Sequence, residues 1–114
     1  MRDDGSRLQD ILDAIDLIEK YTREGHSVFD ENELIQVWVV HHLQILGEAA
    51  NKLSSDLRLA NPHVPWSKII GMRHVLVHDY TGVDAEAVWA AVEKDLPVLK
   101  PQIEDILSDL GGPA

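Results

Sequence analysis

Cysteine is missing from this chain of 114 residues. Without a thiol, the chain can form neither a disulfide framework nor a thiolate metal site, and a cysteine nucleophile is excluded as well. Long apolar runs are missing too, since a run such as Val37–Val40 is far too short to cross a bilayer. The first residues, Met1–Gly5, lack the apolar region of a signal peptide. We therefore expect a soluble, cytoplasmic protein.

Positive charge is scarce in the sequence. Ten lysines and arginines stand against twenty aspartates and glutamates, which gives a formal net charge of -10. Such a charge repels polyanions at long range, so an RNA function has to overcome it. Carboxylates, however, are missing from residues 57–78, which contain Arg58, Lys68 and Arg73. This segment predicts a local surface that tolerates anions.

The length and the composition, 45% hydrophobic and 26% charged, suit a single globular domain over residues 1–114. A capping-box pattern at Ser6 and a stop at Gly25 predict a first amphipathic helix. A second helix of about 20 residues is predicted from the cap at residues 30–33 to Leu53. Pro65 opens a third helix, which carries the reactive segment described below.

The C-terminal part of the sequence predicts two more helices. A turn and cap at Thr81–Asp84 precede a fourth helix over Val88–Leu96, and Pro97 opens a fifth that ends at Gly111. About five helices joined by short connections predict an all-α fold, an up-and-down helical bundle.

The second predicted helix is apolar around most of its circumference as far as Leu46. Its β-branched run at 37–40 could form a buried strand, but the continuous capped pattern without turn residues favours a helix. One core cannot cover all of its apolar faces, so we expect a second partner surface and a homodimer. His41 and His42 are expected to be buried, hydrogen-bonded or interface histidines. Gly47 permits close helix packing, and Glu48 either orients Arg73 or faces water.

The reactive side chains gather in the segment from Arg73 to Tyr80, which also contains His74, His78 and Asp79. Arginine grips phosphate in a bidentate fork, and histidine exchanges protons near neutral pH. His78 could carry the proton when a 2′-hydroxyl attacks the adjacent phosphorus, while Arg73 stabilises charge on the phosphoryl oxygens. The pair could therefore cleave RNA without a metal.

Helix geometry limits how Arg73 and His78 can meet. Residues five apart on an ideal helix differ by about 140° in direction, so the two side chains cannot share one tight site on a single helix. Either the helix ends near Val77 and His78 turns back from a loop, or two subunits share the site.

Three structural alternatives stay open. Arg73 could pair with a surface carboxylate, and His78 could cap a helix C-terminus. His74 and His78, four residues apart, could instead be metal ligands, with Asp79, His41 or His42 completing the site. The tryptophans are interpreted as core or interface aromatics: Trp38, Trp66 and Trp89.

In its motifs the chain resembles the HEPN superfamily, and within it the small HepT-like toxins that are encoded beside a minimal nucleotidyltransferase antitoxin. The resemblance covers nearly the whole sequence, and an isolated Arg-x4-His pattern would be weak without the other segments. These segments are Ile45–Ala50, Pro65-Trp66, Ile70–Arg73, the Arg-x4-His-x-Tyr pattern ending at Tyr80, Gly82–Asp84 with Trp89, and Leu96-Pro97.

The resemblance implies a homodimeric toxin that cleaves RNA in a cleft lined by two copies of the motif, without metal or cofactor. Arg73 and His78 would be the catalytic residues, with His74, Asp79 and Glu48 as possible supporting residues. Tyr80 would receive AMP from the nucleotidyltransferase antitoxin, which silences the toxin. The family often has Asn where this chain has His74. The alternative is a non-catalytic HEPN module that binds a nucleotide or the partner nucleotidyltransferase.

Overall fold

The computed structural model of the protein describes residues 3–74, 77–78 and 82–111. Within these ranges the chain is helical apart from short connections and one pair of two-residue strands. The elements are α1 (Asp4–Thr22), α2 (His26–Glu31), α3 (Glu33–Asn51), α4 (Ser55–Ala60), α5 (Trp66–Gly71), β1 (Val77–His78), β2 (Gly82–Val83), α6 (Ala85–Ala90), the π-helical segment η1 (Ala91–Asp95) and α7 (Leu96–Asp109).

The first helix begins earlier than its capping-box pattern predicts. Asp3 is the N-cap of α1, and its side chain accepts a 2.8 Å hydrogen bond from the backbone N–H of Ser6. Ser6 therefore lies inside the first turn instead of capping it. An aspartate at this position also suits the positive end of the helix dipole. Gly25 has a φ of 96° and ends the connection to α2, where the sequence predicts a stop.

The second predicted helix is confirmed as α3. The side chain of Asn32 accepts a 3.1 Å hydrogen bond from the backbone N–H of Ile35 and so caps the helix. One face of α3 packs against α1, and its buried positions include Val39, Leu43 and Leu46. The short helices α2 and α4 join the long helices and were not expected from the sequence.

The third helix is much shorter than predicted. It ends at Gly71, and the next three backbone N–H groups donate to carbonyls three residues back, which tightens the chain into a turn. Glycine is a poor helix residue, and β-branched valines follow at positions 75 and 77. Arg73 and His78 therefore do not lie on one helix. The prediction that the third helix carries the reactive segment is wrong, and of the two alternatives the helix does end before His78, but at Gly71 instead of near Val77.

The predicted fourth and fifth helices are one continuous helical stretch, α6–η1–α7. Pro97 has no N–H to donate and its ring crowds the carbonyl four residues back, so a break was expected there. The chain instead widens into a π-helical turn, in which the N–H of Leu96 donates to the carbonyl of Ala91. Six helical stretches result within the described residues, where the sequence predicts about five.

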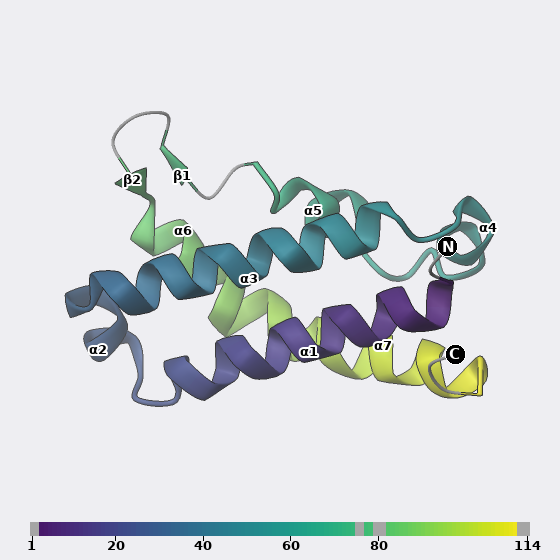
Figure 1. The fold of residues 1–114 in the computed structure, drawn as a ribbon, viewed down its shortest axis with the longest axis horizontal. Helices are drawn as coiled ribbons and strands as arrows, with labels where there is room; N and C mark the ends of the chain where they lie inside the picture. The colour runs from purple at the N-terminus through teal and green to yellow at the C-terminus, as the bar shows by residue number, and fades with distance from the viewer. Residues whose placement is uncertain (1–2, 75–76, 79–81, 112–114) are drawn as a thin grey trace.

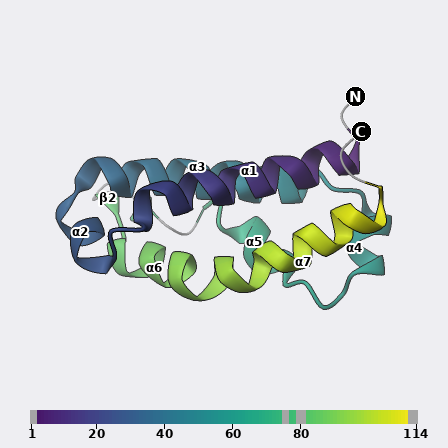
Figure 2. The same ribbon diagram turned by 90° about the horizontal axis from the view of Figure 1, so that it is seen from below.

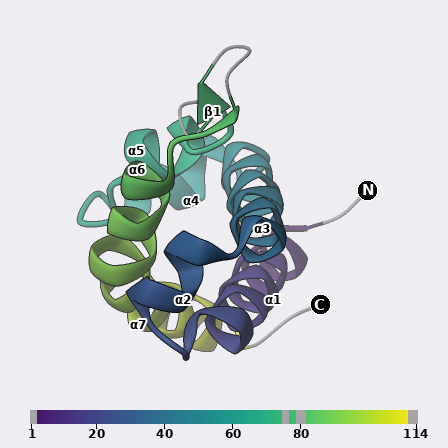
Figure 3. The ribbon, with the colours of Figure 1, turned by 90° about the vertical axis from the view of Figure 1, so that its left-hand side faces the viewer.

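The long helices run side by side and enclose the core (Figure 1). α1 and α3 are antiparallel neighbours, and α6–η1–α7 runs below them as one curved stretch (Figure 2). Viewed from one end, α5 closes the remaining side of the bundle and the β1–β2 pair projects beyond it (Figure 3). The predicted all-α class is confirmed. The core includes Leu8, Ile11, Ile15, Ile18, Phe29, Leu43, Leu46, Val88, Leu96 and Ile103. None of the described helices is long and apolar enough to span a membrane.

Candidate active site

Arg73 lies just beyond the end of α5 and reaches across to α3. Its Nη1 is 3.1 Å from Oε2 of Glu48, and its Nε donates a 3.3 Å hydrogen bond to the carbonyl oxygen of Ile70. The Arg73 side chain is 25% exposed, so the guanidinium is partly enclosed but still open to solvent. Two contacts fix the direction of the guanidinium, and they use only two of its five N–H groups, so the others can still donate to a phosphate.

Gly47 is the reason that Arg73 can approach α3 so closely. A Cβ atom added at Gly47 would lie 2.8 Å from Cγ of Arg73 and 3.0 Å from the carbonyl oxygen of Ile69. Real Cβ atoms do not approach other atoms this closely, so any larger residue would push the end of α5 outward. The predicted close packing at Gly47 is confirmed, and its partner is the segment that carries Arg73.

Glu48 is held by two cations. Besides Arg73, Nζ of Lys52 lies 3.7 Å from Oε1 of Glu48, one turn along α3. The hydrogen bond from Arg73 is the main cause that lowers the pKa of the Glu48 carboxyl, and the charges of both cations act in the same direction against partial burial. Glu48 is therefore an ionised counter-ion that contacts Arg73, and its side chain is also 47% exposed to water, so both predicted positions apply. Its supporting role in catalysis stays a prediction. Lys52 was missed in the sequence, although its i,i+4 spacing from Glu48 is a usable signal.

His78 lies in β1, five residues after Arg73. β1 pairs with β2 in antiparallel register, with Val77 opposite Val83 and His78 opposite Gly82. The side chain of His78 lies outside the described part of the chain, as do Asp79 and Tyr80. Their catalytic, supporting and modification roles stay predictions.

His74 is exposed at the turn after α5, and its backbone N–H donates a 3.0 Å hydrogen bond to the carbonyl of Gly71. Among the described residues, no group of three or more His, Asp or Glu side chains is arranged to hold a metal ion. The alternative metal site requires the side chain of His78, which lies outside the described residues, so it stays a prediction.

The prediction of burial is confirmed for His42 but not for His41, whose role at an interface stays a prediction. His41 is exposed, whereas His42 is only 7% exposed and packs its ring 4.4 Å from that of Trp38. Burial, and then the nearby His41, lower the pKa of His42, so its neutral form is favoured. Nε2 of His42 has no hydrogen-bond partner within the described residues.

The three tryptophans have structural partners. Trp38 donates to the carbonyl of Leu17, Trp66 to that of Asn61, and Trp89 to the carboxylate of Glu93. Trp66 is buried, while the other two are partly covered at the rim of the bundle. Trp66 is confirmed as a core residue and Trp89 packs against the core, whereas an interface role of Trp38 stays a prediction.

Comparison with known proteins identifies the family. Residues 11–106 match a family model that is described as "Ribonuclease HepT-like". A protein of Methanocaldococcus jannaschii that is named provisionally as an RNase is 37% identical over 112 residues, which cover 97% of this chain and 93% of the relative. The "Probable ribonuclease HepT" of Thermococcus cleftensis is 37% identical over 102 residues, covering 87% of this chain and 91% of the relative.

A third relative comes from Caldanaerobacter subterraneus and is also named provisionally as an RNase. It is 34% identical over 91 residues, which cover 80% of this chain and 81% of the relative. No solved structure matches the chain significantly. The match to the family model and the near full-length coverage of these relatives agree with the motifs that first pointed to HEPN proteins. The chain is a member of the HepT-like family of HEPN-type ribonucleases.

Proposed function

We propose that this protein is the toxin of a toxin–antitoxin pair, a metal-independent endoribonuclease that uses Arg73 and His78. The observation that carries the proposal is the guanidinium of Arg73, which Glu48 and the Ile70 carbonyl hold in a fixed and partly solvent-accessible position. Membership of a ribonuclease family supports an RNA substrate.

The proposed reaction needs a proton carrier and a group that stabilises charge. His78 removes the proton from the 2′-hydroxyl, whose oxygen then attacks the neighbouring phosphorus, while the bond from phosphorus to the 5′-oxygen breaks. A proton returns to that leaving oxygen, so the products are a cyclic phosphate and a free 5′-hydroxyl. Arg73 stabilises the negative charge that develops on the phosphoryl oxygens.

We further propose that the protein works as a homodimer that associates through the α1–α3 face. On α3, exposed side chains recur at intervals of three and four residues, and they continue into Glu48 at the candidate site. A contact along this stripe around a two-fold axis would bring the two Glu48–Arg73 pairs toward one cleft. The large apolar side chains that this face exposes are Leu17, Tyr21, Leu34, Val37 and Ile45.

Silencing is proposed to occur at Tyr80. The tyrosine oxygen would attack the α-phosphorus of ATP on the nucleotidyltransferase antitoxin, with release of pyrophosphate and loss of the hydroxyl proton. The resulting AMP group carries a negative charge two residues from His78, where it would block the cleft and compete for Arg73.

The deciding experiment is cleavage of a mixed cellular RNA pool in EDTA by protein that was expressed without an antitoxin. Wild type and a His63→Ala control, which removes an exposed histidine from the loop before α5, should both cleave. His78→Ala should fold and be inactive. Cleavage by His78→Ala at the wild-type rate would remove His78 from the mechanism, and cleavage that needs added Mg²⁺ would refute metal independence. Inactivity of all three proteins would favour the non-catalytic binding module.

A further inference from the structure

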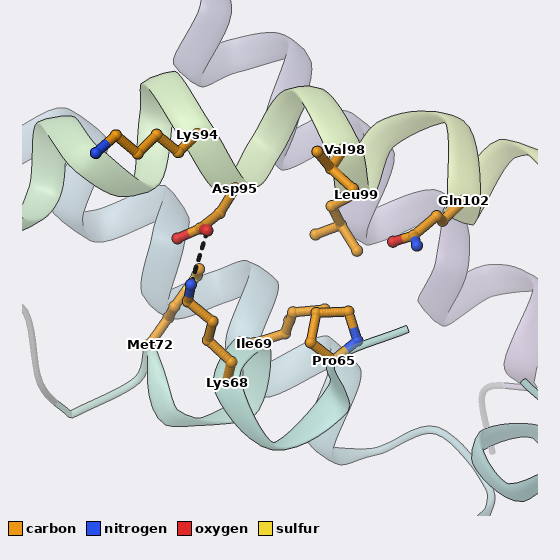
Figure 4. A pocket seen from close by; sticks show the side chains of 9 residues that line it. All are labelled: Pro65, Lys68, Ile69, Met72, Lys94, Asp95, Val98, Leu99 and Gln102. Carbon is orange, nitrogen blue, oxygen red and sulfur yellow. Dashed lines mark hydrogen bonds and ion pairs between the residues drawn. The ribbon is translucent and has the colours of Figure 1, made fainter. Parts of the chain in front are cut away.

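A groove of about 190 Å³ lies between α5 and the η1–α7 stretch, next to the turn that carries Arg73 (Figure 4). Its lining combines buried apolar side chains, such as Ile69 and Leu99, with charged and polar ones. The volume is smaller than the pockets that hold drug-sized ligands, so it suits one flat ring rather than a larger molecule. The side chains that line it are Pro65, Lys68, Ile69, Met72, Lys94, Asp95, Val98, Leu99 and Gln102.

The π-helical segment contributes polar groups to the groove. Lys94 and Asp95 are the last two residues of η1, and both line the pocket. The wider turn of a π-helix shifts side chains relative to a regular α-helix, and such turns occur often at functional sites. Pro97 maintains this geometry because it cannot supply the missing α-helical hydrogen bond.

The polar side chains of the groove include one ion pair, one lysine that is in no ion pair with the described residues, and one amide whose oxygen accepts no hydrogen bond from them. Nζ of Lys68 lies 2.8 Å from Oδ1 of Asp95, and this ion pair crosses the groove in Figure 4. Lys94 makes no ion pair with the described residues. The side-chain oxygen of Gln102 is enclosed and has no hydrogen-bond partner among them. The two lysines and the single carboxylate leave one positive charge in excess, in a chain whose net charge is -10.

The groove and the candidate active site share α5. Ile69 and Met72 line the groove, while the carbonyl of Ile69 and the side chain of Arg73 face Gly47 on α3. Met72 and Arg73 are consecutive, so their Cα atoms are about 3.8 Å apart. The Arg73 side chain faces α3 and the groove faces η1–α7, so a strand of RNA that places a phosphate at Arg73 has to turn around the end of α5 to lay a neighbouring base in the groove.

We propose that this groove binds an unpaired nucleobase of the RNA substrate, next to the phosphate that is cleaved. Apolar walls sandwich the ring, as they do where enzymes hold an unstacked base. A change of the Gln102 rotamer would bring its enclosed oxygen and its amino group, an acceptor and a donor side by side, to the base, a pattern that matches the edge of adenine best. Lys94 neutralises the adjoining phosphate. The inference rests on the proposed ribonuclease function, because only then is the bound RNA a substrate. Binding of the base can be measured without catalysis.

The first test is an NMR titration of the full chain with AMP, with ribose 5-phosphate as the ligand that lacks the base. AMP should shift the amide signals of Lys68, Leu99 and Gln102, and ribose 5-phosphate should not. Gln102→Leu should weaken AMP binding about tenfold, because it removes both hydrogen bonds to the base. Gln9→Leu is the matched control, since Gln9 lies on α1 outside the groove and bonds only to Asp13 among the described residues.

The second test is sequencing of the cut ends that wild type, Gln102→Leu and Gln9→Leu produce from the same RNA pool. Wild type and Gln9→Leu should favour adenine beside the cut, and Gln102→Leu should lose that preference while it still cleaves. If no protein cleaves, the ribonuclease proposal fails and the AMP titration still decides whether the groove binds a base. Absence of AMP shifts at the groove would overturn the inference. Protection of the same amides by the nucleotidyltransferase, without AMP binding, would overturn it in favour of a protein docking site.

Discussion

Replacement of Gly47 by alanine tests whether close packing at α3 positions Arg73. The added Cβ would lie 2.8 Å from Cγ of Arg73, 3.0 Å from the carbonyl oxygen of Ile69 and 3.2 Å from the backbone nitrogen of Arg73. Two of these three atoms belong to the backbone, so a change of rotamer cannot relieve the contact. The end of α5 must move by several tenths of an ångström, and Arg73 must move with it.

Two effects of opposite sign determine the stability of Gly47→Ala. Alanine is favoured over glycine inside a helix by about 1 kcal/mol. Overpacking of a close contact costs about 1–3 kcal/mol. The contact involves rigid backbone, so we expect the overpacking cost to be larger and the net loss of unfolding free energy to be about 1 kcal/mol, or a fall in Tm of about 4–8 °C for a small domain.

Gly71→Ala is the matched control for this variant. Gly71 ends α5 two residues before Arg73, its φ is not positive, and a Cβ there meets no atom within 4 Å. We therefore expect Gly71→Ala to be neutral or slightly stabilising and to cleave RNA normally. Urea denaturation gives the two free energies, and RNA cleavage gives the functional effect, where Gly47→Ala should lose at least tenfold. If Gly47→Ala is as stable and as active as Gly71→Ala, the packing at Gly47 does not position Arg73.

Three further predictions concern assembly, silencing and pH. Leu34→Glu, on the α1–α3 face, should lower the dimer fraction that sedimentation measures. Leu59→Glu, at a similarly exposed site on α4, should leave that fraction unchanged. A monomeric wild type would contradict this prediction. Mass spectrometry after incubation with the nucleotidyltransferase and ATP should find one added AMP in wild type and Tyr21→Phe but none in Tyr80→Phe, and AMP on Tyr80→Phe would place the modification elsewhere. Burial lowers the pKa of His42, so below pH 6.5 the unfolded chain binds a proton at this residue more readily than the native state does. The free energy of unfolding should therefore fall from pH 7 to pH 5, by up to about 1.4 kcal/mol per pH unit. His42→Leu should flatten that fall in urea titrations, and an unchanged slope would assign it to other groups.

The sequence predicts the long elements well because their signals are local and repeated. The cap at Asn32 and the apolar period of α3 give its bounds nearly correctly. The end of α5 at Gly71 was missed because the apolar pattern continues past it into residues that pair as a short strand. A hydrophobic period cannot distinguish those two states over so few residues.

The candidate site was predicted in composition but not in geometry. Arg73 was found from its motif, and Glu48 from the cost of an unpaired charge on an apolar helix. That the two meet depends on how α5 crosses α3 at Gly47, which is a long-range contact. The groove with Lys94, Asp95 and Gln102 had no sequence signal, because Pro97 looked like a helix start and the π-helical turn before it follows from tertiary packing.

The ion pair between Arg73 and Glu48 has a consequence for how the protein would respond to ionic strength. Arg73 is already neutralised by its own chain, and the whole chain has a net charge of -10, so few counterions would be released when RNA binds. Under the proposed function, affinity for RNA would fall only gently as salt is added, unlike that of a basic RNA-binding protein. The enzyme would then bind most polyanions weakly and act on RNA whose shape brings one phosphate to the N–H groups of Arg73 that Glu48 and the Ile70 carbonyl leave unused.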